Sequence, residues 1–180
     1  MGFMEETGAG QHYRDAKITT IYEGTNGVQA MDLLGRKIVR DGGEAAQIFM
    51  EKVEKTIDQL DLKIESHASL SKHLKDGVGA LRETVDWMLD TFKLEPGYAA
   101  AGATALVEMM GLISGGWMLA RGAIEASRQI SDGSGDPKFL SSKLVTARYF
   151  AEVHLSRASS LVGPIKNGGS CVMDFDAAQF

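Results

Sequence analysis

The sequence of 180 residues has little cysteine: Cys171 is the only one, and it lies in a polar, glycine-rich stretch near the C-terminus. A single cysteine cannot form an internal disulfide, so nothing in the sequence indicates an oxidising compartment. The first ten residues, MGFMEETGAG, lack the basic start and apolar core of a secretory signal. We therefore expect a reducing, cytoplasmic location, with no catalytic role for this thiol because no basic partner lies near it.

Runs rich in lysine and arginine are also missing. The chain has 19 basic and 24 acidic residues, a net charge of -5 and a pI near 5.4. This acidic balance disfavours a nucleic-acid partner. The hydrophobic fraction of 44% excludes a disordered chain, and the length suits one compact domain or one domain with an appendage.

Only one stretch, Tyr98 to Ala120, has so few charges that it resembles a membrane span. Its sole charge, Glu108, would fall near the centre of the bilayer, where a carboxylate is costly. Most of its other residues are alanine, glycine and methionine, which insert weakly. We therefore expect a tightly packed helix of a bundle and no membrane span.

No segment alternates with the period of two that a strand requires, whereas apolar residues three and four apart recur after Gly24. The first helix is predicted from about Asn26 to Arg40, with Thr25 as N-cap and Asp41-Gly42-Gly43 as its stop. The same spacing predicts four further helices, over about 45–65, 70–93, 98–130 and 137–162.

Turn residues mark the limits of the later helices. An interruption or a bend is expected at Gly115-Gly116, and Asp136 with Pro137 is a favourable helix start. Glu95-Pro96-Gly97 and Gly163-Pro164 are predicted to end helices.

These elements predict an all-α fold: an antiparallel, up-down helical bundle preceded by a short helical segment. We divide the chain into residues 1–42, with the chemical motif described below, a four-helix bundle over 43–163 and a tail over 164–180. The first part has too little apolar surface to fold alone, which suggests that it belongs to a larger domain.

The histidines and methionines are predicted to be structural. His67 and His73 are six residues apart, which leaves them on different helix faces, and no cysteine or acidic cluster completes a metal site. Met109, Met110 and Met118 have the spacing of core residues that fill irregular gaps.

Three blocks near the N-terminus carry a family resemblance: MGFMEE at 1–6, YRDAKI at 13–18 and IYEGTNGVQ at 21–29. Together they resemble the C-terminal region of the acyl-CoA dehydrogenases, and Arg14 and Asp15 are expected to form a structural ion pair there. The bundle resembles the additional C-terminal domain of the long, bacterial-type members. The resemblance implies that the domains that bind most of the flavin lie outside this sequence, and that this part alone is inactive.

The resemblance implies that Glu23 is a catalytic base. The α-protons of an acyl-CoA thioester are weakly acidic, so their removal needs a positioned base and stabilisation of the developing oxyanion. Glu23 would take the α-proton while the β-hydrogen passes as hydride to N5 of FAD, which gives a trans-2-enoyl-CoA. Desolvation in an acyl pocket raises the pKa of such a carboxylate toward the value that this task requires.

The residues after Glu23 are assigned by the same resemblance. Gly24 would lie against the thioester, because glycine lets the backbone approach closely. FAD contacts are implied for Thr25, Asn26 and Gly27, with only the backbone of Gly27 involved.

Several alternatives stay open at this stage. The expected electron acceptor is an electron-transfer flavoprotein, but acyl-CoA oxidases share this architecture and use oxygen. The resemblance likewise implies that the protein acts in fatty acid β-oxidation and assembles into dimers or tetramers. The bundle could also be a non-catalytic module for oligomerisation or interaction.

Overall fold

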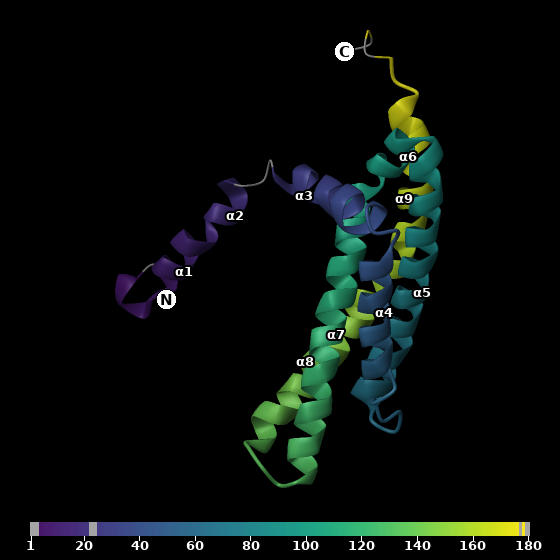
Figure 1. Cartoon of the computed structure of the whole chain (residues 1–180). Coiled ribbons are helices and arrows are strands. Elements are labelled where there is room, and N and C mark those ends of the chain that lie inside the picture. The colour runs from purple at the N-terminus through teal and green to yellow at the C-terminus, as the bar shows by residue number, and fades with distance from the viewer. Residues whose placement is uncertain (1–3, 22–24, 177, 179–180) are drawn as a thin grey trace.

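The structure is a computed structural model that describes residues 4–21, 25–176 and 178 (Figure 1). Its regular elements are helical, and no strand occurs in the described part of the chain, which confirms the predicted all-α class. The elements are η1 (Glu5–Thr7), α1 (Ala9–Ala16), α2 (Ile18–Ile21), α3 (Asn26–Asp32), the π-helical η3 (Leu33–Val39), α4 (Glu44–Ile57), α5 (Glu65–Leu94), α6 (Pro96–Ala101), α7 (Ala103–Ser131), α8 (Pro137–Val153), η4 (Leu155–Leu161) and α9 (Val162–Met173).

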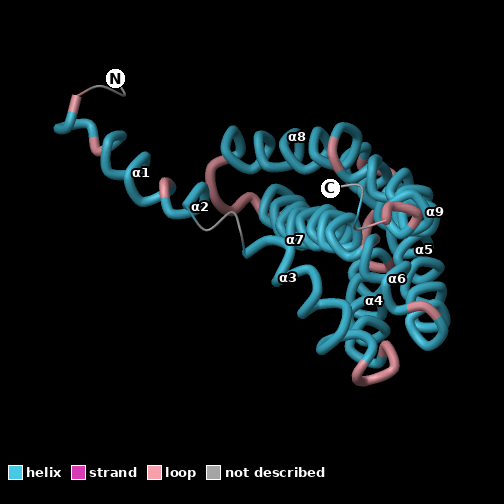
Figure 2. Tube along the Cα trace, turned by 90° about the horizontal axis from the view of Figure 1, so that it is seen from above, coloured by secondary structure: helices cyan, strands magenta, loops and turns pink. Residues whose placement is uncertain are grey.

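The long helices form an antiparallel bundle, as predicted. α4, α5 and α7 run in alternating directions, and the chain then returns along α8, η4 and α9 (Figure 1). Seen from above, α6 and α9 lie side by side next to α5, while α3 crosses beside α7 (Figure 2). α4, the first helix of the bundle, packs against both η3 and α5.

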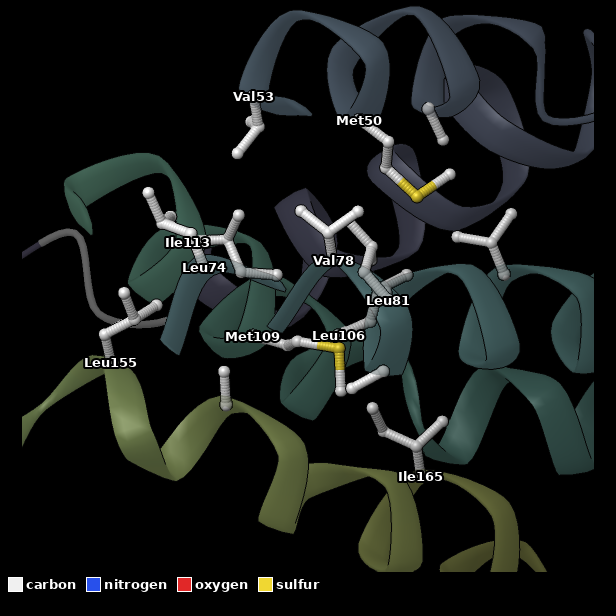
Figure 3. Close-up of a cluster of buried hydrophobic side chains, with 14 of the residues drawn as sticks. Met50, Val53, Leu74, Val78, Leu81, Leu106, Met109, Ile113, Leu155 and Ile165 are labelled. Atoms are coloured by element: carbon white, nitrogen blue, oxygen red, sulfur yellow. The ribbon is translucent and has the colours of Figure 1, made fainter. Parts of the chain in front are cut away.

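The core lies where α5, α7, η4 and α9 meet (Figure 3). Its central side chains are at most 3% exposed: Leu74, Val78 and Leu81 from α5, Leu106, Met109 and Ile113 from α7, Leu155 from η4 and Ile165 from α9. Because these residues come from distant parts of the sequence, burial of their apolar surface holds the bundle together.

The N-terminal helices η1, α1 and α2 lie apart from the bundle (Figure 1). Within them Arg14 makes two hydrogen bonds to the carboxylate of Glu5, at 3.0 and 3.1 Å. The predicted pairing of Arg14 with Asp15 is therefore wrong: adjacent side chains of a helix point in different directions, whereas Glu5 of η1 faces Arg14.

Two predicted helix boundaries are confirmed. Gly42 and Gly43 have φ of 68° and 88°, a conformation that favours glycine, and Asp41 accepts hydrogen bonds from the backbone N–H groups of Gly43 and Ala45. Asp136 caps α8 by accepting from the N–H of Lys138 at 3.0 Å, with Pro137 in the first position.

The predicted boundary between the next two helices is displaced. α4 ends at Ile57 and α5 begins at Glu65, whereas the sequence predicts one helix to 65 and the next from 70. The backbone N–H of Asp61 donates to His67 Nδ1, and Asp61 Oδ1 accepts from the N–H of Lys63. These bonds stabilise a turn that contains neither glycine nor proline; its sequence signal is the less specific one of an aspartate, Asp61, whose side chain accepts from the N–H two residues on.

The predicted interruption at Gly115-Gly116 does not occur, and the alternative of a bend there stays a prediction. α7 is continuous from Ala103 to Ser131, and the interruption falls at Gly102, between α6 and α7. The two glycines instead allow close packing: a Cβ at Gly116 would lie 2.6 Å from Leu155 Cδ2, and one at Gly115 would lie 2.9 Å from Phe150 Cζ.

Gly163-Pro164 does not end helical structure. Both residues lie in the first turn of α9, which continues to Met173, so residues 164–173 are helical where a tail is predicted. Proline is tolerated in a first turn because the N–H that it lacks has no partner within the helix there. The limits of the three predicted domains stay predictions.

Gly169 of α9 provides a test of this packing. A Cβ there would lie 2.9 Å from both Cα and O of Tyr98, which are backbone atoms of α6. Gly169→Ala should therefore lower the free energy of unfolding by about 1–3 kcal/mol through overpacking. The neighbouring Gly168→Ala, which would meet nothing within 4 Å, should instead raise it by about 0.5–1 kcal/mol. Urea denaturation measures both, and equal effects would contradict this packing.

By length and composition, α7 is the one helix in the described ranges that is apolar enough to cross a membrane, with mean hydropathy 1.3 over its most apolar window. A single such helix is weak evidence, because core helices of soluble proteins pass the same test. α7 packs against α5, α8, η4, α3 and α4. The expectation that the chain has no membrane span stays a prediction.

Candidate functional site

The motif that sequence analysis singles out immediately precedes α3. Glu23 and Gly24, the predicted base and substrate contact, lie outside the described residues, so their roles stay predictions. Thr25 occupies the N-cap position, as predicted, although its side chain makes no capping hydrogen bond to the helix. Asn26 and Gly27 form the first turn of α3.

α3 is fixed to the bundle by α7. Ala30, in the middle of α3, is only 2% exposed, and the two helices pack together there. A concavity of about 300 Å³ lies beside this contact. Asn26, Gln29 and Ala30 of α3 line it, together with Thr104, Val107 and Glu108 of α7. One of the predicted cofactor contacts thus faces the bundle.

The described residues of the motif have room for a polar ligand. Asn26 is exposed, and a Cβ placed on Gly27 would meet nothing within 4 Å. Amide groups such as that of Asn26 both donate and accept hydrogen bonds. The structure thus leaves room for a polar ligand at Asn26 and Gly27, and the FAD contacts of Thr25, Asn26 and Gly27 stay predictions.

Sequence reasoning missed the contribution of α7 to this pocket. Thr104 and Glu108 are more than seventy residues from Asn26, and no local pattern connects them. Glu108 is held by an ion pair in which Arg157 Nη2 lies 3.3 Å from Glu108 Oε1. Only the packing of α3 on α7 brings these side chains together.

His67 makes a different polar contact, inside the bundle. Its side chain is buried, with Nδ1 accepting from the N–H of Asp61 at 3.2 Å and Nε2 lying 3.0 Å from Ser127 Oγ. Because Nδ1 is an acceptor, the neutral ring carries its proton on Nε2 and donates it to the serine. His67 therefore cannot act as a base toward Ser127, and the pair is structural.

His67→Ala should lower the free energy of unfolding by about 1–3 kcal/mol, because two buried hydrogen bonds of α5 are lost, one to the α4–α5 turn and one to α7. Urea denaturation followed by circular dichroism measures the change. His12→Ala is the matched control, since His12 is exposed on α1. Equal stability of the two variants would show that the His67 contacts contribute nothing.

His73 gives the bundle a pH dependence. Burial, followed by the charge of Lys72, lowers the pKa of His73 below its ordinary value of 6.5. The unfolded chain therefore binds a proton more readily than the folded chain, so stability is greatest above about pH 6.5 and falls as the pH decreases. Relative to His73→Gln, the wild type should lose stability between about pH 7.5 and pH 5.5. Parallel curves of unfolding free energy against pH would contradict this.

A larger concavity, of about 380 Å³, is lined by residues of α7 and α8. Figure 1 shows these two helices extending away from α3. Met118 and Phe139 line this concavity. Met118 is 45% exposed, so the prediction that Met118 is a core residue is wrong. Met109 is fully buried, as predicted. Hydrogen bonds from Arg128 lower the pKa of nearby Glu125 to about 2. Glu125 and Arg128 are exposed and belong to the same helix, α7, so their ion pair does not join α7 to α8 across the pocket.

Within the residues that the structure describes, no group of three or more histidine, cysteine or acidic side chains could hold a metal ion. Cys171 is exposed. The α3–α7 pocket is thus the described feature that adjoins the sequence motif.

A helical chain in which α3, directly after the motif, packs against an antiparallel bundle defines a class of protein, and comparison with known families identifies it. The family described as "Acetyl-CoA dehydrogenase C-terminal like" matches residues 49–176, and "Acyl-CoA dehydrogenase, C-terminal domain" matches residues 1–38. The chain belongs to the acyl-CoA dehydrogenase family and corresponds to its C-terminal domains.

Curated relatives agree with this assignment. The chain is 37% identical to a 3-methylmercaptopropionyl-CoA dehydrogenase of Ruegeria pomeroyi over 96% of its own length and 29% of the relative. It is 31% identical to the broad-specificity linear acyl-CoA dehydrogenase FadE5 of Mycobacterium tuberculosis, over 99% of the chain and 30% of the relative. A butyryl-CoA dehydrogenase of Syntrophomonas wolfei is 26% identical over 83% of the chain and 25% of the relative. The chain thus spans about 30% or less of the length of these relatives.

Proposed function

We propose that this chain is the C-terminal part of an FAD-dependent enzyme that oxidises acyl-CoA thioesters to trans-2-enoyl-CoA. The observation that carries the proposal is the IYEGT block at 21–25, which falls inside the region matched by the acyl-CoA dehydrogenase C-terminal domain. All three relatives are named as dehydrogenases of acyl-CoA compounds. Their names differ in the acyl group, so the proposal stops at the class of thioester.

Glu23 takes the α-proton of the substrate in this reaction. Its carboxylate forms a new O–H bond as the Cα–H bond breaks, and the released electron pair becomes part of the new Cα–Cβ double bond. The Glu23 backbone N–H donates to the thioester oxygen, where negative charge develops. Gly24 leaves space for the thioester, while Thr25, Asn26 and Gly27 hold the cofactor. FAD held by these three residues would supply the acceptor for the hydride from Cβ.

The assay that tests the proposal uses the natural polypeptide that contains this chain. Anaerobic addition of a saturated acyl-CoA should reduce the bound flavin and yield one equivalent of 2-enoyl-CoA, identified by mass spectrometry. An acyl-CoA without hydrogen on Cβ is the control and should leave the flavin oxidised. Absence of FAD, or of any enoyl product from a series of linear and branched substrates, would overturn the proposal.

The electron acceptor is proposed to be an electron-transfer flavoprotein, in cytoplasmic fatty acid β-oxidation. An acyl-CoA oxidase would instead transfer electrons to oxygen, and hydrogen peroxide production during turnover distinguishes the two.

The 180-residue chain alone is expected to be inactive. Assembly as a homodimer or homotetramer is likewise proposed, and light scattering of the complete polypeptide tests it.

A second role is proposed for the bundle itself. Its core extends from α3 and η3 through α4, α5, α7, η4 and α9, whereas the separate helices η1 and α1 contribute no buried residue. This observation favours a non-catalytic module for support or oligomerisation beside the catalytic segment. Both roles can hold in one polypeptide.

A further inference from the structure

The outer face of α8 is apolar, although the exposed face of a helix is normally polar or charged. Within the described chain α8 packs against α5, α7 and η4, and it lies at the edge of the bundle (Figure 2). Val145, Tyr149 and Val153 are 68%, 59% and 44% exposed, and they recur every four residues. Residues at this spacing lie on one side of a helix. They form an exposed apolar row, which we call the α8 stripe.

The polar residues beside the α8 stripe keep their hydroxyl groups bonded within the chain. Ser142 and Thr146 of α8 and Ser156 of η4 each donate to the backbone carbonyl four residues earlier, at 2.9, 2.9 and 2.7 Å. Burial of a hydroxyl is costly only where it has no hydrogen bond. These three hydroxyls therefore do not oppose burial of the stripe against a partner.

A concavity of about 170 Å³ lies beside the stripe, where α8 meets the start of α5. Val145 of the stripe lines it together with Arg148 and Ser66. Ser66 is only 6% exposed, and its Oγ has no hydrogen-bond partner in the described chain. Arg148 already pairs with Glu65 and Glu152, so the concavity does not suit an anion. An apolar group that carries a neutral hydroxyl fits both the lining and the unpaired serine.

The charges along α8 favour a second copy of this chain as the partner. Lys138 lies in the first turn of α8 and Glu152 in the last. A parallel neighbour would bring like charges together, whereas an antiparallel copy places Lys138 near the partner's Glu152. A two-fold axis between Val145 and Tyr149 then sets each tyrosine opposite the partner's Val145, beside the concavity.

We propose that the α8 stripe binds the α8 stripe of a second copy of this chain, with the two helices antiparallel. The partner's Tyr149 packs into the concavity beside Val145, where its phenol hydroxyl satisfies Ser66 Oγ. Each copy contributes one tyrosine and one concavity, so the contact is closed and stops at a dimer. This inference rests on the second role proposed above for the bundle, and it names the surface and the partner.

Sedimentation equilibrium of the 180-residue chain tests the contact. One helix buries less area than a standard interface, so the wild type should dimerise with a Kd of about 1–100 μM. Tyr149→Arg places two like charges at the centre of the contact and should raise this Kd at least about tenfold. Tyr149→Phe removes only the hydroxyl and should raise it about three- to tenfold. Leu94→Arg, at an exposed leucine at the opposite end of α5 from Ser66, is the control and should leave it unchanged.

Exchange of charges tests the antiparallel orientation. Lys138→Glu and Glu152→Lys should each weaken the dimer, and the double variant should regain affinity because the facing charges are opposite again. Circular dichroism should show the same helix content in every variant. Additive losses in the double variant would overturn the antiparallel contact.

Two results would overturn the inference as a whole. One is a Tyr149→Arg variant that dimerises like the wild type. The other is a wild-type chain that is monomeric throughout the concentration range, which would leave another part of the complete polypeptide as the occupant of the stripe. Neither result depends on flavin chemistry, so flavin reduction in the complete polypeptide tests the proposed dehydrogenase function independently.

Discussion

Replacing Glu23 by glutamine should lower the rate of acyl-CoA dehydrogenation by about 10²- to 10⁴-fold, the usual contribution of a general base. Glutamine has nearly the shape of glutamate, but its amide oxygen is not basic enough to take a proton from the α-carbon. The backbone N–H at this position is unchanged, so donation to the thioester oxygen is kept. The rate of flavin reduction by substrate in the complete polypeptide measures the effect.

Flavin content and a neighbouring substitution control this experiment. FAD should remain bound to Glu23→Gln, because the cofactor contacts are assigned to Thr25, Asn26 and Gly27. Glu6→Gln, which removes an exposed carboxylate from the same N-terminal segment, should turn over at the wild-type rate. Unchanged flavin reduction in Glu23→Gln would show that another residue is the base. Loss of FAD from that variant would show a binding role.

Leu74→Ala should lower the free energy of unfolding of the bundle by about 2–5 kcal/mol, the range for truncation of a buried leucine. Leu74 of α5 is fully buried in the core, near Ile113 of α7 and Leu155 of η4 (Figure 3). Its removal leaves a cavity where α5, α7 and η4 meet, which close packing prevents the surrounding helices from filling completely. Urea denaturation of the 180-residue chain measures the change.

Leu94→Ala is the matched control for this substitution. Leu94 is the last residue of the same helix and is 84% exposed, so its truncation should change stability by less than about 0.5 kcal/mol. A small effect of Leu74→Ala, comparable to that of Leu94→Ala, would mean that the region around Leu74 does not pack as the structure shows.

Features set by local chemistry could be predicted from the sequence. The stop at Asp41-Gly42-Gly43 needs glycines with positive φ, and the start at Asp136-Pro137 needs a capping carboxylate and a residue with a fixed φ. Both are determined within a few residues, so the sequence alone indicates them. The all-α class follows similarly from apolar residues repeated at helical spacing.

Features set by distant contacts could not be predicted in this way. The turn before Glu65 depends on His67, whose second hydrogen-bond partner is sixty residues away in α7. A glycine at position 116 is compatible with a helix bend, but in the structure Gly116 leaves space for the side chain of Leu155 of η4. The α3–α7 pocket needs the relative position of two helices that no local pattern sets. For Glu23 and Gly24 the prediction rests on resemblance, because they lie outside the described residues.

Exchange of α-protons for solvent deuterium tests most directly whether Glu23 is the base of an acyl-CoA dehydrogenase. The substrate should be an acyl-CoA with no hydrogen on Cβ, so that the α-proton can be removed and returned without oxidation. Incubated in D₂O, the complete wild-type polypeptide with bound FAD should incorporate deuterium at Cα, detected by mass spectrometry, and Glu23→Gln should not. Equal incorporation by the two proteins would contradict the assignment of Glu23 as the base.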